Sequence, residues 1–341
     1  MMHPTPRIFR QDPSGLGKPW LILIHGLGLS HKSWTDPFAE SLLDGWLSFD
    51  YVLTDYNRST SGIQFPCFRL LSCSPPLRLS PDPPSSFWDV FQKDGHGLLT
   101  WSQEDPRRGI SHAVDELQKV LEGIGPPEKR ILIGHSRGGL IARRFMQECR
   151  PGCDRVTGLV LMGVPHGGSQ IARLAKIFLR THLYPGKNQK KARMSKRNDR
   201  SFGGLLRWLG SYGNNEGIEE LVPRSLFLQS LYSGAKEERM RKIPYLNLIG
   251  TRTDFIRLYP LGFSPKSKTK PSFSLLGGFE KILPRHLVPS EIRQGRGDGL
   301  VSVESAHLAW ALSNQFVPVN HAQFLVDQGV KNKIKQFIEN L

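Results

Sequence analysis

The sequence predicts an α/β protein with a doubly wound, mostly parallel sheet covered by helices on both faces. The first observation behind this is a set of short runs with consecutive apolar side chains, at residues 19–24, 131–133 and 156–162. Strands that are apolar on both faces are typical of a parallel sheet between helices. The second observation is that segments with helical periodicity lie between such runs, as they do in βαβ units.

Further elements follow the same logic along the chain. We expect strands at residues 19–24, 49–56, 131–133, 156–162, 243–249 and 315–319. Ser111 is a plausible N-cap for a helix that places Val114, Leu117, Val120 and Leu121 on one face. The C-terminal segment spaces Val326, Val330, Ile334, Phe337 and Ile338 as an amphipathic helix that would cover one face of the sheet.

Two insertions interrupt this pattern in what we expect to be a single domain over residues 1–341. Residues 57–110 are rich in proline, which predicts an extended insertion with little secondary structure. Residues 169–242 form a second insertion, and within it residues 173–200 carry ten Lys or Arg against Asp199 as the one acid. This segment is either a solvated, partly helical excursion or a mobile cap whose apolar face meets lipid.

The composition is strongly basic, with a net charge of +16 and a pI near 9.9. Such a charge favours association with anionic surfaces, although the sequence contains no recognisable nucleic-acid-binding module. The N-terminus lacks the apolar stretch of a secretory signal, and no run approaches the roughly 18 apolar residues of a membrane span. We therefore expect a cytoplasmic protein that can contact an anionic membrane peripherally, with no nucleic acid as partner.

Cys149 and Cys153 are the only closely spaced cysteines that suggest a site. Four residues of separation would suit half of a metal site, but no second pair with ligand spacing accompanies them. We therefore expect reduced thiols at the end of a helix.

The chemistry centres on Ser136, in the sequence Gly134-His135-Ser136-Arg137-Gly138 between an apolar strand and a helical pattern. This G-x-S-x-G elbow exposes a serine nucleophile on a sharp turn where a base can reach it. Backbone N–H groups of Arg137 and of Leu27, in a glycine-rich loop, are the expected oxyanion donors. Because these donors are main-chain, the side chains of Leu27 and Arg137 are expected to matter only for substrate fit.

A serine nucleophile needs a histidine base and a carboxylate that orients it, in the chain order Ser, acid, His. Asp254 follows a strand directly and Asp298 lies in a Gly-Asp-Gly turn, so both carboxylates stay open as candidates. Of the histidines downstream, His286 lies in a basic loop, and His307 lies in an apolar helical run that predicts a packed core residue. His321 comes just after the last predicted strand and is the expected base.

Several motifs together resemble those of the α/β-hydrolase lipases, in particular the bacterial triacylglycerol lipases and the related lipase-like deacylases that act on GPI anchors. They are HGLG at 25–28, GHSRGG at 134–139, GVPHGGS at 163–169, GDGLVS at 297–302 and NH at 320–321. The resemblance covers residues 19–170 and 243–341. It implies an α/β-hydrolase fold with a helical cap insertion, favours Asp298 over Asp254 as the acid, and implies a structural role for His166.

The resemblance also bears on cofactors and on activity. Some of these lipases hold calcium through an Asp soon after the catalytic His, but Ala322 and Gln323 follow His321, so we expect no metal and no cofactor. The predicted activity is hydrolysis of a carboxylic ester, on a lipid-like acyl substrate, through an acyl-enzyme formed on Ser136. A thioesterase or amidase with the same triad, and a non-catalytic protein that binds anionic membrane surfaces, are the alternatives.

Overall fold

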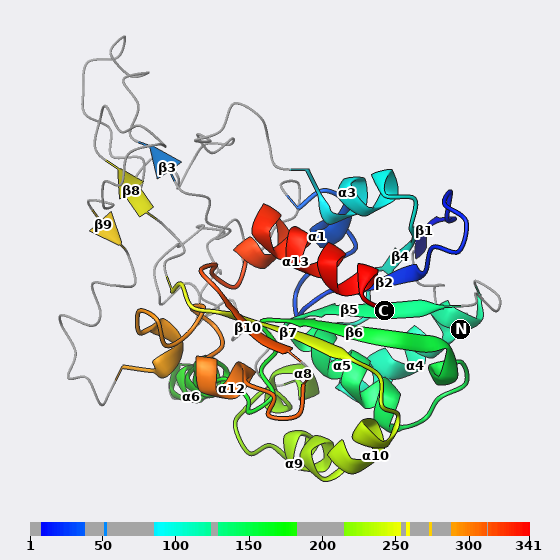
Figure 1. The fold of residues 1–341 in the computed structure, drawn as a ribbon. Coiled ribbons are helices and arrows are strands. Elements are labelled where there is room, and N and C mark those ends of the chain that lie inside the picture. Colours follow the sequence, from blue (N-terminus) through cyan, green and yellow to red (C-terminus); the bar gives the residue numbers. More distant parts are fainter. Residues whose placement is uncertain are drawn as a thin grey trace, which may run out of the picture.

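The computed structural model contains a seven-stranded sheet with strand order β1-β4-β2-β5-β6-β7-β10 (Figure 1). Only β1 runs antiparallel to its neighbour β4, and the other five pairs are parallel. The strands span Ile8–Gln11 (β1), Trp20–Ile24 (β2), Gly97–Trp101 (β4), Arg130–His135 (β5), Val156–Met162 (β6), Tyr245–Gly250 (β7) and Ser313–Val317 (β10). The described residues are 8–37, 51–52, 85–123, 129–182, 215–253, 257–259, 273–274, 288–311 and 313–341.

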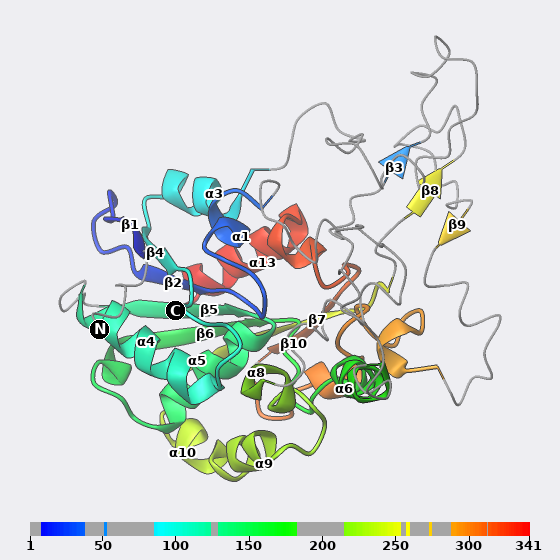
Figure 2. The ribbon, with the colours of Figure 1, turned by 180° about the vertical axis from the view of Figure 1, so that it is seen from behind.

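Helices cover both faces of this sheet (Figures 1 and 2). One face carries α4 (Ile110–Glu122) and α5 (Arg137–Gln147), and the other carries α1 (Lys32–Thr35), α3 (Phe87–Lys93) and α13 (Gln328–Glu339). Strands β2 and β5 between them are buried along their whole length. This arrangement confirms the predicted doubly wound, mostly parallel sheet, and α13 confirms the predicted C-terminal helix by burying Val330, Ile334 and Phe337.

The prediction of little secondary structure over residues 57–110 is wrong for its described part. Helix α3 begins there at a capping box, in which Ser86 accepts from the Asp89 N–H and the Asp89 carboxylate accepts from the Ser86 N–H. Strand β4 follows and lies between β1 and β2, fully buried. The run of prolines ends at Pro84, so the sequence interpretation extended their effect about 25 residues too far.

The strand predicted at 49–56 is confirmed over Tyr51–Val52 (β3), and the rest of that range lies outside the described residues. β3 pairs with β8 (Arg257–Tyr259) in a separate sheet that also contains β9 (Phe273–Ser274). The N-cap predicted at Ser111 is wrong. Helix α4 begins one residue before Ser111, with Gly109 as its N-cap. Carboxylates from the 169–242 segment take over the capping role there, because Glu216 accepts from the Gly109 N–H and Glu220 accepts from the Ile110 N–H.

The segment 169–242 is helical where it is described, with α6 (Gln170–His182), α8 (Glu216–Glu219), α9 (Leu226–Ser233) and α10 (Ala235–Met240). A buried ion pair joins α10 to α5, since Arg143 donates from Nε and Nη2 to the two carboxylate oxygens of Glu238, each at 3.0 Å. Residues 183–214, which hold most of the predicted positive cluster, lie outside the described residues. Movement of this segment as a cap therefore stays a prediction.

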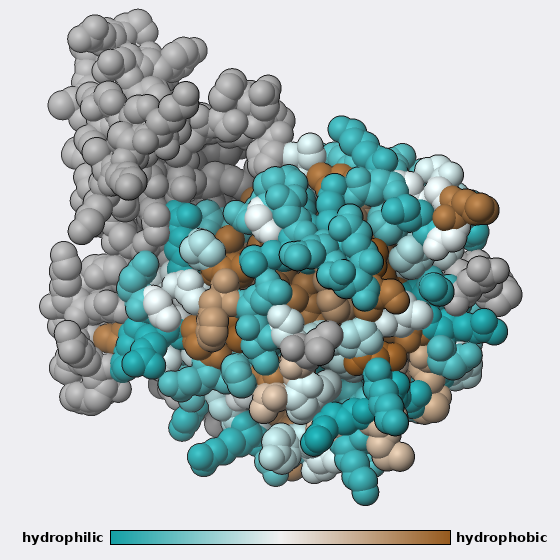
Figure 3. Space-filling model, in the orientation of Figure 1, coloured by the Kyte–Doolittle hydropathy of each residue, from teal (hydrophilic) through white to brown (hydrophobic). Residues whose placement is uncertain are grey.

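The surface seen in Figure 3 is mainly hydrophilic over the described part, with hydrophobic residues in small patches among polar ones. Large exposed apolar side chains come from different elements, among them Leu16, Leu226 and Phe316. Within the described residues, no helix combines the length and apolarity that crossing a membrane requires.

Candidate active site

Ser136 lies at the junction of β5 and α5, where the chain turns sharply. Its φ of 55° and ψ of −126° lie outside the regions that a non-glycine residue normally adopts, and such strain is typical of functional positions. The Ser136 N–H donates to the carbonyl of Met162 at the end of β6, at 2.9 Å. A Cβ on Gly138 would lie 2.2 Å from the Ile24 carbonyl oxygen of β2, so the turn can close only with glycine there.

Asp298 and His321 form a buried pair at the same end of the sheet. The Nδ1 of His321 lies 2.7 Å from the Oδ2 of Asp298, with side-chain exposures of 7% and 1%. The other carboxylate oxygen accepts from the N–H groups of Leu300 at 3.0 Å and Val301 at 2.7 Å, which fixes the carboxylate with Oδ2 turned to the histidine. The His321 N–H also donates to the Asp298 carbonyl at 2.9 Å, so backbone and side chain both hold the pair.

His135, the elbow residue before Ser136, contacts His321 of this pair. Its ring centroid lies 4.8 Å from that of His321, and its Nε2 donates to the His321 carbonyl at 2.9 Å. Burial, and then the neighbouring His321, holds the pKa of His135 well below its ordinary value, so the ring is neutral. The backbone of Gly163 packs against the pair so closely that a Cβ there would lie 2.9 Å from Asp298 Oδ2 and 3.1 Å from His321 Nδ1.

The glycine-rich loop after β2 lies against Ser136. A Cβ on Gly26 would lie 3.0 Å from the Cβ of Ser136, which brings the backbone before Leu27 next to the serine. Arg137 is the first residue of α5, where N–H groups have no acceptor within the helix. The structure thus places Gly26, the residue before Leu27, beside Ser136. The oxyanion role of the Leu27 and Arg137 N–H groups stays a prediction and is taken up below.

Comparison with known proteins adds the family to this geometry. Residues 21–259 match the family model described as "Alpha/beta hydrolase family". The chain belongs to this family. A search of curated proteins found no matching relative of this hydrolase.

Some solved structures are similar to this hydrolase in fold. The lipase BlEst2 of Bacillus licheniformis in its mature form has a TM-score of 0.53 and 16% identity, over 97% of this chain and 98% of that one. The propeptide form of the same lipase has a TM-score of 0.52 and 17% identity, over 98% of this chain and 54% of that one. An esterase, RhEst1 from Rhodococcus sp. ECU1013, has a TM-score of 0.45 and 14% identity, over 98% of this chain and 96% of that one.

The side chain of Arg137 corrects an expectation drawn from the sequence. It was expected to matter only for substrate fit, but in this hydrolase it is fully buried and engaged by the protein itself. Its Nη1 donates to the Gln103 side chain at 2.6 Å and its Nη2 donates to the Arg108 carbonyl at 2.5 Å. Burial lowers its pKa to about 10, which leaves it charged at neutral pH. The guanidinium therefore holds the loop that follows β4.

Gln103 connects Arg137 to the glycine-rich loop after β2. Its backbone N–H donates to Nε2 of His25 at 3.1 Å, and its side-chain amide donates to the His25 carbonyl at 3.2 Å. The remaining ring nitrogen of His25, Nδ1, donates to the Gly26 carbonyl at 2.9 Å. Sequence reasoning missed Gln103 because it lies in the stretch interpreted as a structureless insertion.

The sequence also singled out Asp254, His286, His307 and His166. Asp254 and His286 are outside the described residues. His307 is exposed at the end of the short helix α12 (Val303–Ala306), so the prediction of a core histidine was wrong because the helical run expected over 306–312 does not form. His166 accepts from Arg143 Nη1 at 3.1 Å, and burial holds its pKa well below the ordinary value.

One group in the described part of the hydrolase brings three metal-type ligands together. Atoms of Glu104, His112 and Glu116 lie within 4.8 Å of one another. The Glu116 carboxylate is already engaged, because it accepts from the Trp101 indole and the Glu104 N–H and lies 3.2 Å from His112. These contacts explain the cluster as part of the packing of α4 against β4.

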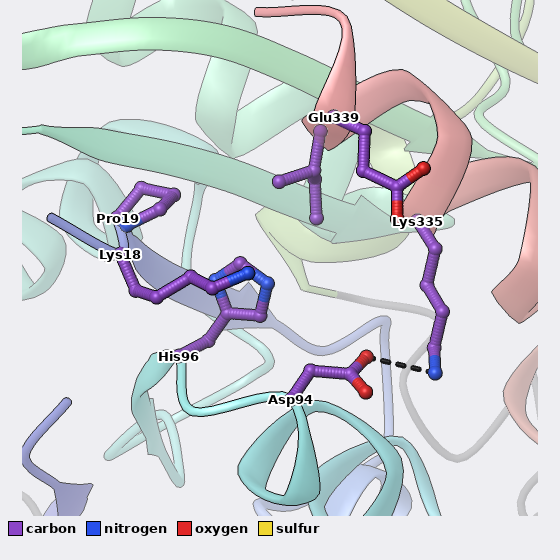
Figure 4. Close-up of a pocket in the computed structure, with 7 residues that line it drawn as sticks. Lys18, Pro19, Asp94, His96, Lys335 and Glu339 are labelled. Atoms are coloured by element: carbon purple, nitrogen blue, oxygen red, sulfur yellow. Dashed lines mark ion pairs between the residues drawn. The ribbon is translucent and has the colours of Figure 1, made fainter. Parts of the chain in front are cut away.

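A pocket of about 340 Å³ opens at the opposite end of the sheet (Figure 4). Lys18 and Pro19 lie just before β2, and Asp94 and His96 lie just before β4. An ion pair of 2.8 Å joins Asp94 to Lys335 of α13 across it. Because Ser136 follows the carboxyl end of β5, which is parallel to β2, this pocket lies a strand's length from the elbow.

Proposed function

We propose that this α/β hydrolase is a serine hydrolase that cleaves carboxylic esters, as a lipase or carboxylesterase, through an acyl-enzyme intermediate. The observation that carries the proposal is the buried 2.7 Å pair of His321 and Asp298, in contact through His135 with a strained Ser136. A buried carboxylate at Nδ1 favours the tautomer of the neutral ring in which Nε2 faces outward as the base.

In the proposed reaction, the hydroxyl of Ser136 attacks the ester carbonyl while His321 takes its proton. Asp298 holds His321 in the required tautomer and stabilises the imidazolium that forms. The N–H groups of Leu27 and Arg137 donate to the oxygen that becomes negative. His321 then returns the proton to the leaving alcohol, and water removes the acyl group by the same route in reverse.

The substrate side of the proposal rests on less specific features. The chain's net charge of +16 suits an anionic or interfacial substrate, and we propose an acyl ester of lipid-like character presented at an anionic membrane surface. Sedimentation with vesicles of anionic and of neutral lipid at low and at moderate salt tests this part. Equal binding to both kinds of vesicle would contradict it.

Turnover of p-nitrophenyl esters of graded chain length by the wild type and by Ser136→Ala tests the chemistry. We expect loss of at least ~10³-fold in kcat for the variant, because the nucleophile is gone and only substrate binding remains. Labelling of the wild type, and not of Ser136→Ala, by a fluorophosphonate probe is the matching control. Equal turnover by both proteins would refute the assignment, and faster turnover of the matched acyl thioesters would move it to a thioesterase.

A further inference from the structure

A pair of thiols lies at the far end of α5 from the nucleophile. Cys149 follows the last residues of this helix with a φ of 51°, and Gly152 adds a second left-handed turn with a φ of 82° before Cys153. The chain thereby folds back on itself, and the two sulfur atoms lie 3.5 Å apart. Both cysteines are free, and a disulfide of about 2.05 Å needs them to approach by only about 1.5 Å.

The two thiols differ in access. Cys149 is exposed, whereas Cys153 is buried with 5% of its surface exposed. A reagent in solution therefore reaches the sulfur of Cys149 first, and Cys153 lies directly behind it. This is the arrangement that a redox-active pair requires, with one accessible attacking sulfur and one protected resolving sulfur.

Arg241, the C-cap of α10, supplies a positive charge to this pair. Its Nη1 lies 3.2 Å from Sγ of Cys153, and its Nε donates to the Met146 carbonyl at 2.7 Å, which holds the guanidinium in place. The pKa of Cys149 lies below its ordinary value, first because Arg241 hydrogen-bonds to its sulfur and next because Cys153 does, while nearby Asp154 opposes the effect. Burial raises the pKa of Cys153, so the exposed sulfur is the better thiolate.

We propose that Cys149 and Cys153 form a peroxide-sensitive dithiol that oxidises reversibly to an intramolecular disulfide. The Cys149 thiolate attacks one oxygen of a hydroperoxide, so that an S–O bond forms, the O–O bond breaks, and the leaving oxygen takes up a proton. The Cys153 sulfur then attacks the Cys149 sulfenic acid, an S–S bond forms, and the hydroxyl departs as water with the Cys153 proton. With hydrogen peroxide, two thiols lose two electrons and one peroxide becomes two waters. Exchange with a small dithiol reverses the oxidation.

Peptide mapping of the full chain with Cys67→Ser and Cys73→Ser tests this directly. Trypsin cuts after Arg144 and Arg155 but not before Pro151, so one peptide holds both thiols. After brief treatment with a few equivalents of hydrogen peroxide and quenching with N-ethylmaleimide, we expect this peptide to lose two hydrogens and to regain them with dithiothreitol. Recovery of the peptide as a doubly alkylated dithiol, or as a sulfonic acid without any disulfide, would overturn the proposal.

Three variants separate the parts assigned to each group. Dimedone should trap a sulfenic acid at Cys149 in Cys153→Ser, and it should not trap one at Cys153 in Cys149→Ser. Arg241→Met should slow alkylation of Cys149 at pH 7 by several-fold, because its thiolate fraction falls. Arg241→Lys keeps a cation and controls for loss of packing, with circular dichroism as the check on folding. Alkylation of Cys149 at the wild-type rate in a folded Arg241→Met protein would contradict the role of the arginine.

Discussion

Acidification should destabilise the folded protein through His25, whose two ring nitrogens have fixed and opposite roles. Nδ1 donates to the Gly26 carbonyl, and Nε2 accepts from the Gln103 backbone N–H. A proton on Nε2 would remove that acceptor and place a charge in a fully buried ring. Burial is the main reason that the pKa of His25 falls from 6.5 to about 4, and the hydrogen bond to the Gly26 carbonyl opposes this fall in part.

The size of the effect follows from this shift. Because the folded-state pKa is depressed, the unfolded chain binds a proton between pH 6.5 and about 4 while the folded protein does not. The contribution of His25 to stability is therefore present above pH 6.5 and is lost as the pH falls toward 4. Between pH 7 and pH 5 the loss from this one residue is about 2 kcal/mol.

Urea unfolding of the wild type and of His25→Asn at pH 7 and at pH 5 measures this contribution. The variant should be less stable at pH 7, since it loses hydrogen bonds, but its further loss on acidification should be smaller than that of the wild type by about 2 kcal/mol. Comparing the two proteins cancels the other buried histidines, which titrate in both. His307→Asn, at an exposed position, should keep the wild-type pH dependence. Equal losses in wild type and His25→Asn would refute the reasoning.

Three further predictions concern the site and its supports. Asp298→Asn keeps an acceptor for the Leu300 N–H but offers an amide N–H to His321. The kcat for p-nitrophenyl esters should therefore fall by roughly 10⁴-fold. An unchanged kcat would exclude Asp298 as the acid of the triad. Glu238→Gln leaves a buried arginine without its charge partner, and urea unfolding should show a loss of about 3 kcal/mol. Gly138→Ala would place a Cβ 2.2 Å from a carbonyl oxygen of β2 and should lower Tm sharply. Gly123→Ala, whose Cβ would meet no atom of the described residues nearer than 3.5 Å, should leave Tm near the wild-type value.

The sequence was sufficient for the features that depend on local pattern. The elbow at Ser136 follows from a strand, a glycine-bounded turn and a helix that are adjacent in the chain, and the structure has these elements there. His321 follows from its place after the last strand. Residue chemistry alone left Asp298 and Asp254 open, because the contact of Asp298 with His321 depends on how the turn after Pro289 folds back, which no local pattern encodes. The resemblance to lipases was needed to prefer Asp298.

Strand β4 shows a different limit. Its five buried residues were overlooked because the prolines before it suggested irregular structure, and losing the strand also lost Gln103, two residues after its end. The hydrogen bonds of Gln103 then could not be anticipated, although they connect the loop after β2 to α5. An error in one strand assignment thus removed a residue from the site as well as an element from the fold.

Buried arginines on α5 are the feature that sequence patterns predict least well. Arg137 and Arg143 would ordinarily be assigned to the surface, yet both are buried, and their partners Gln103 and Glu238 lie 34 and 95 positions away in the chain. Arg137 holds the loop that positions the backbone beside Ser136, and Arg143 holds α10 of the basic insertion. One helix thus begins directly after Ser136 and fixes two segments distant in sequence. Substitutions of its buried arginines should therefore alter the loop after β2 and the attachment of α10 separately, depending on which arginine is removed.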